Sequence, residues 1–240
     1  MQPISAISQL HAAPAGVLLG IDTCGPTGSV ALGRMSGGKT EVLGQIELEG
    51  RTYSSTLVSA VGKLLADAGI QLRSLAGIVA VSGPGSFTGV RVGLAAVKGL
   101  AEAAQIPVVA VSRLEVLVSK SGTASAALDA HRHEVFLCLG RPGLEPRELL
   151  AGAAELAAIA PAPQRIAVCD DAAVALLQAA WPGAEMVRVP APSAADALVF
   201  GASRLTAGEF ADLALLDGHY LRRSDAEIFG DPVAPGTPGA

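Results

Sequence analysis

The stretch SGPGSFTGVRVG, from Ser82 to Gly93, joins an apolar run to a helical pattern and is the most distinctive part of the sequence. The run before it, AGIVAV at residues 76–81, is typical of a buried strand. After it, apolar residues recur at helical spacing over residues 89–104. Three glycines and one proline within residues 82–89 restrict the backbone to an unusual path. The stretch therefore predicts a strand, a tight loop and a helix in succession.

Outward from this loop, hydrophobic periodicity predicts the same order of elements twice. In the first half we expect strands at residues 17–22, 29–34, 41–49, 76–81 and 107–111, and helices at 54–68, 89–104 and 112–119. In the second half we expect strands at residues 125–129, 134–140, 144–148, 165–169 and 185–189, and helices at 152–159, 171–180 and 193–206. Each half reads βββαβαβα, which is the ribonuclease-H-like plan. Two such α/β domains in tandem form the actin-like ATPase (ASKHA) architecture.

This order of elements suggests a division of the chain. We expect an N-terminal extension at residues 1–16, a first ribonuclease-H-like domain at 17–112 and a second at 113–223. Residues 224–240 are expected to form a flexible tail, because their proline and glycine content leaves little apolar area to bury.

Composition limits the class of protein. Apolar residues make up 50% of the 240 residues and charged residues only 16%, which favours a folded core. The formal net charge of −5 argues against tight nucleic-acid binding by this chain alone. Apolar runs fall short of the ~20 residues of a membrane span, and three widely spaced cysteines predict neither a zinc site nor a disulfide framework. Without a basic signal-peptide region at the N-terminus, we expect a cytoplasmic location.

The end of the first expected strand is one candidate for chemistry. In actin-like ATPases an aspartate at this place faces magnesium and phosphate across a turn, and here Asp22 and Thr23 occupy it. A carboxylate and backbone N–H groups at a strand end suit that role. The alternative is that both residues only cap a hairpin.

The glycine-rich loop is the second candidate, and its residues are Gly83, Pro84, Gly85, Ser86, Phe87, Thr88 and Gly89. Ser86 and Thr88 can cap the following helix, whose free N–H groups suit an anion. The loop lacks the Gly-Lys-Ser/Thr ending of a P-loop. A purely structural turn is the alternative.

Other chemistries fit the sequence poorly. His131 and His133 flank Arg132 in an expected turn, and no third metal ligand is evident. Ser86 lies in a sharp turn, but the G-x-S-x-G elbow of a serine hydrolase is absent. We therefore expect neither a metal site nor a peptidase.

Four pieces of sequence carry a resemblance to a known family. They are LLGIDTCGPTGSVAL, VSGPGSFTGVRVGLAAVKGLA, LDAHRHEVF and HYLRR, in this order. They are similar to the bacterial TsaB (YeaZ) family, which is paralogous to the catalytic TsaD (Kae1-like) subunit. The resemblance spans residues 17–223.

The resemblance implies a function and partners. It implies an accessory, non-catalytic subunit for making N6-threonylcarbamoyladenosine at position 37 of ANN-decoding tRNAs. TsaD is the implied partner that transfers the group, and the ATPase TsaE joins the pair. The resemblance further implies a homodimer when the chain is alone, contact with tRNA only through the complex, and no membrane. No cofactor is expected in the isolated chain, although a nucleotide at the interface with TsaD is compatible with the family.

The sequence departs from the catalytic paralogue in a way that agrees with this role. TsaD binds metal through a His-x-x-x-His motif on a helix of its first half, and the expected helices at residues 54–68 and 89–104 contain no histidine. Two departures from the family itself are modest. Cys24 stands where a small Ser or Ala is usual, and Tyr53 replaces a common histidine.

The two helices of the first half are the expected partner surface. A row of small residues on the second helix allows close approach of another helix, and the resemblance implies the same face. The interface residues we expect are Leu57, Val61, Leu64, Gly89, Gly93, Ala96 and Leu100. Packing on the chain's own sheet is the alternative.

A second function stays open at this point, an actin-like phosphotransferase acting on a small metabolite. It requires a Gly-Gly pair for adenosine in the second half and a catalytic aspartate between the lobes. The second-half strand that ends at Val168-Cys169-Asp170-Asp171 lacks the paired glycine.

Overall fold

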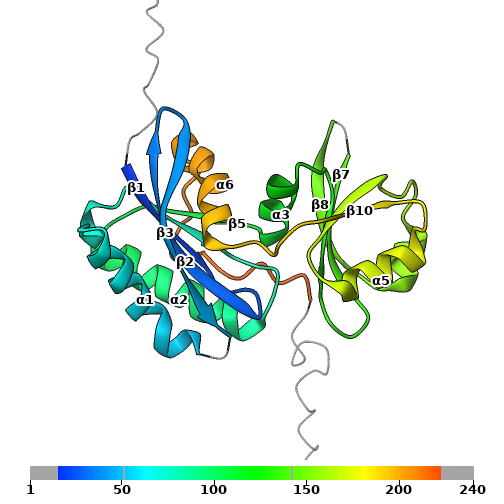
Figure 1. The fold of residues 1–240 in the computed structure, drawn as a ribbon, viewed down its shortest axis with the longest axis horizontal. Helices are drawn as coiled ribbons and strands as arrows, with labels where there is room; N and C mark the ends of the chain where they lie inside the picture. The colour runs from blue at the N-terminus through cyan, green and yellow to red at the C-terminus, as the bar shows by residue number, and fades with distance from the viewer. Residues whose placement is uncertain (1–15, 51, 142, 223–240) are drawn as a thin grey trace, which may run out of the picture.

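The computed structural model describes residues 16–50, 52–141 and 143–222, which form two lobes, each built on a five-stranded mixed sheet (Figure 1). The first sheet has the order β3 (Lys39–Glu49), β2 (Thr27–Ser36), β1 (Gly16–Asp22), β4 (Gly77–Val81) and β5 (Val108–Val111). The second has the order β10 (Glu185–Arg188), β9 (Arg165–Val168), β6 (Ala126–Asp129), β7 (Val135–Arg141) and β8 (Leu144–Ala151). In chain order, the first three strands of each sheet (β1–β3 and β6–β8) pair antiparallel, and the last two (β4 and β5, β9 and β10) are added in parallel.

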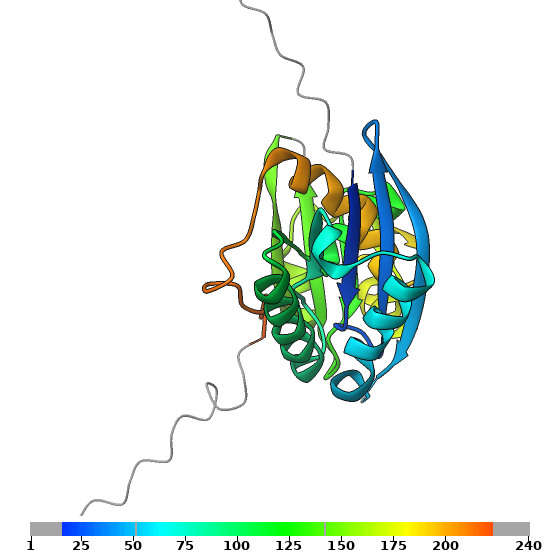
Figure 2. The ribbon, with the colours of Figure 1, turned by 90° about the vertical axis from the view of Figure 1, so that its left-hand side faces the viewer.

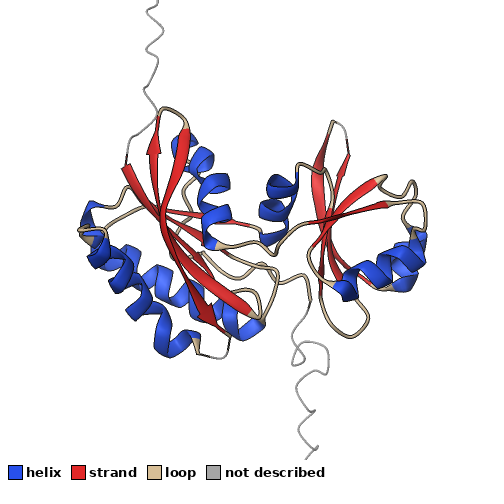
Figure 3. Ribbon diagram, in the orientation of Figure 1, coloured by secondary structure: helices blue, strands red, loops and turns tan. Residues whose placement is uncertain are grey.

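Helices cover both faces of each sheet (Figure 3). They are α1 (Tyr53–Asp67), α2 (Phe87–Ala104), α3 (Arg113–Ser121), α4 (Ala153–Ala158), α5 (Asp171–Ala180) and α6 (Ala194–Ala207), with a 3-10 turn at Leu72–Ser74. The order βββαβαβα therefore occurs in both halves, and the predicted ribonuclease-H-like, actin-like α/β fold is confirmed. The predicted tail at residues 224–240 and most of the predicted N-terminal extension lie outside the described residues, and Gly16 already belongs to β1.

The helix that closes each half packs on the sheet of the other half. Leu114 and Leu117 of α3 are buried with Phe136 of the second sheet. In return, Leu198 and Leu205 of α6 are buried in the core of the first sheet. The expected second domain at residues 113–223 therefore does not pack as one unit, because α6 belongs to the first lobe. Figure 1 shows both helices between the two sheets.

Polar contacts join α3 to α6 where the lobes meet. Lys120 of α3 lies 2.8 Å from a carboxylate oxygen of Asp196, and Arg204 of α6 lies 2.6 Å from one of Glu115. Glu115 also completes the capping box of α3, accepting from the N–H of Ser112 at 3.0 Å. A residue that caps this helix thus also takes part in the contact between the lobes.

The segment at residues 208–222, which we name the strap, follows α6 and runs from the first lobe to the second (Figure 1), and Figure 2 shows it along one side of the molecule. Its Ala211 N–H donates to the carbonyl oxygen of Val108 at 2.8 Å in the first sheet. At its other end, Nε2 of His219 lies 2.7 Å from a carboxylate oxygen of Glu148, and Arg222 pairs with Glu134. The strap therefore connects both sheets a second time.

The His219–Glu148 contact makes the strap sensitive to pH. The hydrogen bond to Glu148 raises the pKa of His219 above 6.5, against the opposing effect of partial burial. A raised pKa means that this contact stabilises the fold fully below about pH 6.5 and loses its effect as pH rises through the raised value. We expect the difference in unfolding free energy between the wild type and His219→Gln to shrink with rising pH, measured by urea denaturation. A difference that is constant with pH contradicts this assignment.

Candidate functional site

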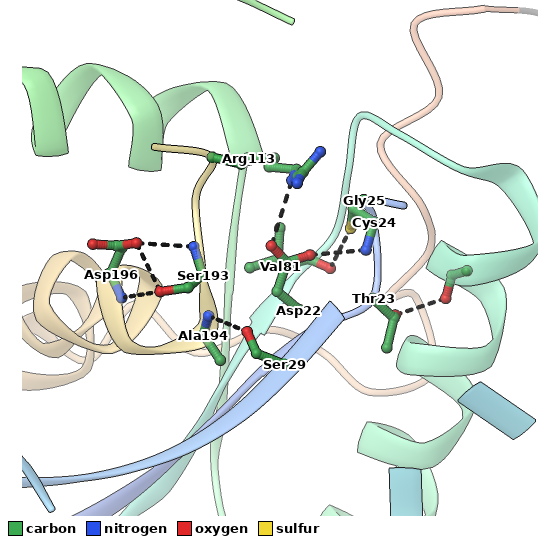
Figure 4. Close-up of polar contacts among 12 residues, drawn as sticks. Asp22, Thr23, Cys24, Gly25, Ser29, Val81, Arg113, Ser193, Ala194 and Asp196 are labelled. Carbon is green, nitrogen blue, oxygen red and sulfur yellow. Dashed lines mark hydrogen bonds and ion pairs between the residues drawn. The ribbon is translucent and has the colours of Figure 1, made fainter. Parts of the chain in front are cut away.

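The turn after β1 holds a buried ion pair. Asp22 is only 1% exposed, and its Oδ1 accepts a hydrogen bond from the N–H of Cys24 at 2.8 Å. Its Oδ2 lies 3.4 Å from Nε of Arg113, the first residue of α3 (Figure 4). The charge of Asp22 raises the pKa of Arg113 despite its burial, so the guanidinium stays charged. Both carboxylate oxygens of Asp22 therefore have partners within the chain.

The glycine-rich loop packs directly on this turn. The N–H of Ser86 donates to the carbonyl oxygen of Cys24 at 2.8 Å, and the hydroxyl of Thr23 donates to that of Gly89 at 2.7 Å. A Cβ at Gly85 would lie 2.2 Å from the backbone carbonyl oxygen of Cys24, and one at Gly89 would lie 2.1 Å from the backbone carbonyl oxygen of Thr23. These distances leave no room for a side chain, which is the physical reason for the glycines.

The loop leads into α2, which begins at Phe87 rather than at the expected Gly89, so that Phe87, Thr88 and Gly89 belong to its first turn. Oγ of Ser86 accepts a hydrogen bond from the N–H of Gly89 at 3.2 Å and so caps the helix. Thr88 is exposed, and Phe87 packs its ring against Tyr220 of the strap with centroids 5.1 Å apart. Gly83 and Pro84 are buried in the bend that precedes them.

Tyr53 and Cys24 close the other side of the turn. The hydroxyl of Tyr53 donates to the carbonyl oxygen of Gly25 at 2.8 Å, and burial raises its pKa to about 12. Burial and the nearby charge of Asp22 also raise the pKa of the Cys24 thiol well above its usual range. Cys24 stays protonated at neutral pH and donates to the carbonyl oxygen of Val81 at 3.4 Å. The two departures from the family pattern thus serve packing.

The turn does not fit a magnesium ion with a nucleotide phosphate. The Asp22 carboxylate is already balanced by Arg113, and the side chains of Thr23 and Cys24 donate to the backbone carbonyl oxygens of Gly89 and Val81. Nη2 of Arg113 would lie 2.4 Å from a Cβ at Gly25, so the guanidinium fills the space beside the turn. This geometry supports reading Asp22 and Thr23 as a vestigial nucleotide turn.

Carboxylates of the second lobe are engaged in a similar way. Asp170 caps α5 by accepting from the N–H of Ala173 at 2.7 Å, and its other oxygen accepts from the N–H of Asp129 at 3.0 Å. Asp129 in turn accepts from the N–H of His131 at 2.8 Å. Both acids hold loops in place.

The turn between β6 and β7 has an unusual backbone. His131, Arg132 and His133 have φ values of 58°, 56° and 60°, which are left-handed conformations that side chains disfavour. Together with α5 they line an open hollow of about 520 Å³. Within residues 16–50, 52–141 and 143–222, no three His, Cys, Asp or Glu side chains gather in a way that could hold a metal ion.

The predicted partner residues need correction. Leu57, Val61 and Leu64 are only 1%, 2% and 6% exposed and belong to the first lobe's core. Gly89 and Gly93 are buried against Thr23, so the row of small residues serves the chain's own turn. Their prediction as interface residues was wrong.

Ala96 and Leu100 are only partly buried and pack against the same core. The outer face of α1 and α2 is made of other residues, among them the exposed Val58, Gly62, Lys63, Arg91, Ala95 and Gly99. Figure 1 shows the two helices side by side on the outer face of the first sheet.

Sequence comparison identifies the family. Residues 40–163, just over half of the chain, match the family described as "tRNA N6-adenosine threonylcarbamoyltransferase" (TsaD). The "tRNA threonylcarbamoyladenosine biosynthesis protein TsaB" of Haemophilus influenzae is 35% identical over 125 residues, which are 50% of this chain and 51% of that protein. The TsaB protein of Bacillus subtilis is 37% identical over 123 residues, with 50% and 52% covered. The chain belongs to the TsaD-like proteins, in their TsaB (YeaZ) family.

Structure comparison agrees. YeaZ from Pseudomonas aeruginosa superimposes with a TM-score of 0.65 at 25% identity, covering 86% of this chain and 100% of that one. A second Pseudomonas aeruginosa structure, described as similar to peptidase YEAZ, gives a TM-score of 0.67 at 26% identity. The sequence matches to TsaB span about half the length of the curated relatives.

Sequence reasoning missed Arg113 in this TsaB-family chain. A charged residue two positions after the apolar strand β5, directly behind the helix cap Ser112, was a usable signal. Its partner Asp22 lies 91 residues away, which no local pattern reveals.

Two glycines of α2 allow a matched test of the turn. A Cβ at Gly93 would lie 2.2 Å from the Thr23 hydroxyl, whereas Gly99 has nothing within 4 Å. We expect Gly93→Ala to destabilise the chain by about 1–3 kcal/mol through overpacking. Gly99→Ala should stabilise it by up to ~1 kcal/mol, because alanine favours helix. Urea denaturation measures both, and equal effects of the two changes contradict the packing described here.

Proposed function

We propose that this chain is a non-catalytic subunit in the formation of N6-threonylcarbamoyladenosine in tRNA, and that it holds TsaD in an active arrangement. The names of its TsaB relatives and the match to the TsaD family support the pathway. The observation that carries the non-catalytic role is the buried Asp22–Arg113 pair, because it fills the place where an actin-like enzyme needs a free carboxylate.

The thiols also support a non-catalytic role. Burial is the main cause that raises the pKa of Cys138 to about 12 and that of Cys169 to about 11. The pKa of Cys24 is raised as well, chiefly by burial. The thiolate is the nucleophilic form of cysteine, so these side chains are poor nucleophiles at neutral pH.

The surface we assign to TsaD is the outer face of α1 and α2. Val58 on this face is 60% exposed, and the exposed small residues Gly62, Ala95 and Gly99 allow a close approach of helices. An isologous contact through the same face would give the homodimer of the isolated chain. A nucleotide bound at the TsaD interface would then lie outside the turn at Asp22.

The remaining partners follow from the same proposal. TsaE joins the pair, and tRNA is reached only through the complex, which agrees with the net charge of −5. Among the residues that the structure describes, no helix is long and apolar enough to cross a membrane. A cytoplasmic location is part of the proposal. The phosphotransferase alternative gains no support from Asp22 or Asp170. The carboxylate of Asp22 pairs with Arg113, and that of Asp170 accepts hydrogen bonds from two backbone N–H groups.

Reconstitution tests the division of labour. We expect no modified tRNA from this chain with TsaE, tRNA and threonylcarbamoyl-adenylate, and modified tRNA once TsaD is added. Mass spectrometry of digested tRNA measures the product. Modified tRNA without TsaD would contradict the non-catalytic role, and no gain over TsaD with TsaE alone would contradict the accessory role.

Two exposed valines provide a matched test of the partner surface. Val58 on α1 and Val199 on α6 are 60% and 55% exposed. We expect Val58→Arg to weaken TsaD binding about tenfold or more, because a charge is then buried in the contact. Val199→Arg should leave binding unchanged, and surface plasmon resonance on folded proteins measures both. Equal binding by the two variants places the interface elsewhere.

A further inference from the structure

Arg113 connects the two lobes through a buried charge. It begins α3, which packs on the second sheet, yet its side chain pairs with Asp22 in the first lobe. Its backbone N–H also donates to the carbonyl oxygen of Gly83 at 2.6 Å, in the glycine-rich loop. The helix that covers the second sheet is thus held to the first lobe at two points of the same residue.

The pair is shielded from water. The side chains of Arg113 and Asp22 are 7% and 1% exposed, so hydration compensates little of either charge. A buried carboxylate without a cation beside it is strongly destabilising. A guanidinium keeps its charge at every physiological pH, and its planar fork keeps a fixed geometry. Asp22 therefore depends on Arg113 in the folded chain.

The two ion pairs between α3 and α6 are weaker candidates for this role. The side chains of Lys120, Asp196, Arg204 and Glu115 are between 21% and 29% exposed. Solvent screens ion pairs of this kind, so each contributes less than its distance suggests. Of these three pairs, Asp22–Arg113 is the one whose loss leaves an uncompensated charge that is almost fully buried.

We propose that Arg113 takes the place of an exchangeable cation beside Asp22 and locks the two lobes in one arrangement that needs no nucleotide. In actin-like proteins the corresponding aspartate faces magnesium and phosphate, both of which bind reversibly. Here the compensating charge belongs to the chain, and the space beside Gly25 is filled by Nη2 of Arg113. The two lobes then keep one fixed arrangement and present the same surface to a partner.

Chemical rescue tests this role on the full chain. Arg113→Ala removes the cation, and we expect Tm to fall by roughly 10 °C. Methylguanidinium at millimolar concentration should restore part of the loss by binding beside Asp22. Methylurea, which has nearly the same shape without the charge, should not. The matched control is Arg165→Ala, because Arg165 pairs with Glu185 at 3.0 Å on the surface, where the side chains are 55% and 63% exposed.

A double variant gives a second, independent measurement. We expect Asp22→Asn with Arg113→Met to be more stable than Arg113→Met alone, since no buried charge is left unpaired. This comparison also decides the matter if Arg113→Ala does not fold. Rescue by methylguanidinium alone, or coupling in the double variant, supports the proposal. Equal rescue by methylurea, rescue of the Arg165 control, or additive effects of the two substitutions would overturn it.

Discussion

A carboxylate buried at the end of β1 must be balanced by a positive charge, and Arg113 supplies it. Much of the first lobe's loop structure is arranged around this pair. Cys24 donates to Asp22, the glycine-rich loop packs on the same turn, and Tyr53 closes it from α1. Because Arg113 begins α3, the pair also sets where the second lobe starts. One electrostatic requirement thus joins a turn, a loop and two lobes.

The exchange of closing helices extends this connection through the molecule. Helix α3 covers the second sheet and α6 covers the first, so neither lobe completes its core without the other half of the chain. The strap then returns from the first lobe to Glu134 and Glu148. Such a connected body would offer a fixed surface to a partner, which is the property that the proposed scaffold role requires.

Local pattern predicted the elements but not which side of a helix is free. Periodicity placed α5 and β1 within a residue of the observed bounds, because apolar spacing is set by each element's own geometry. We expected Leu57 and Leu64 of the apolar stripe on α1 at the partner surface, yet both residues are buried in the core of the first lobe. Gly93 looked like an interface residue because its contact with Thr23 is far away in sequence. Long-range packing decides such assignments, and single-sequence pattern does not contain it.

We infer that the negative charge of Asp22 is balanced by Arg113 within the chain and that this turn does not bind a nucleotide. Isothermal titration of the full chain with magnesium and ATP tests it most directly. We expect no saturable binding that depends on Asp22. Micromolar binding, worth about 8 kcal/mol, that Asp22→Asn abolishes while the fold is retained would contradict it.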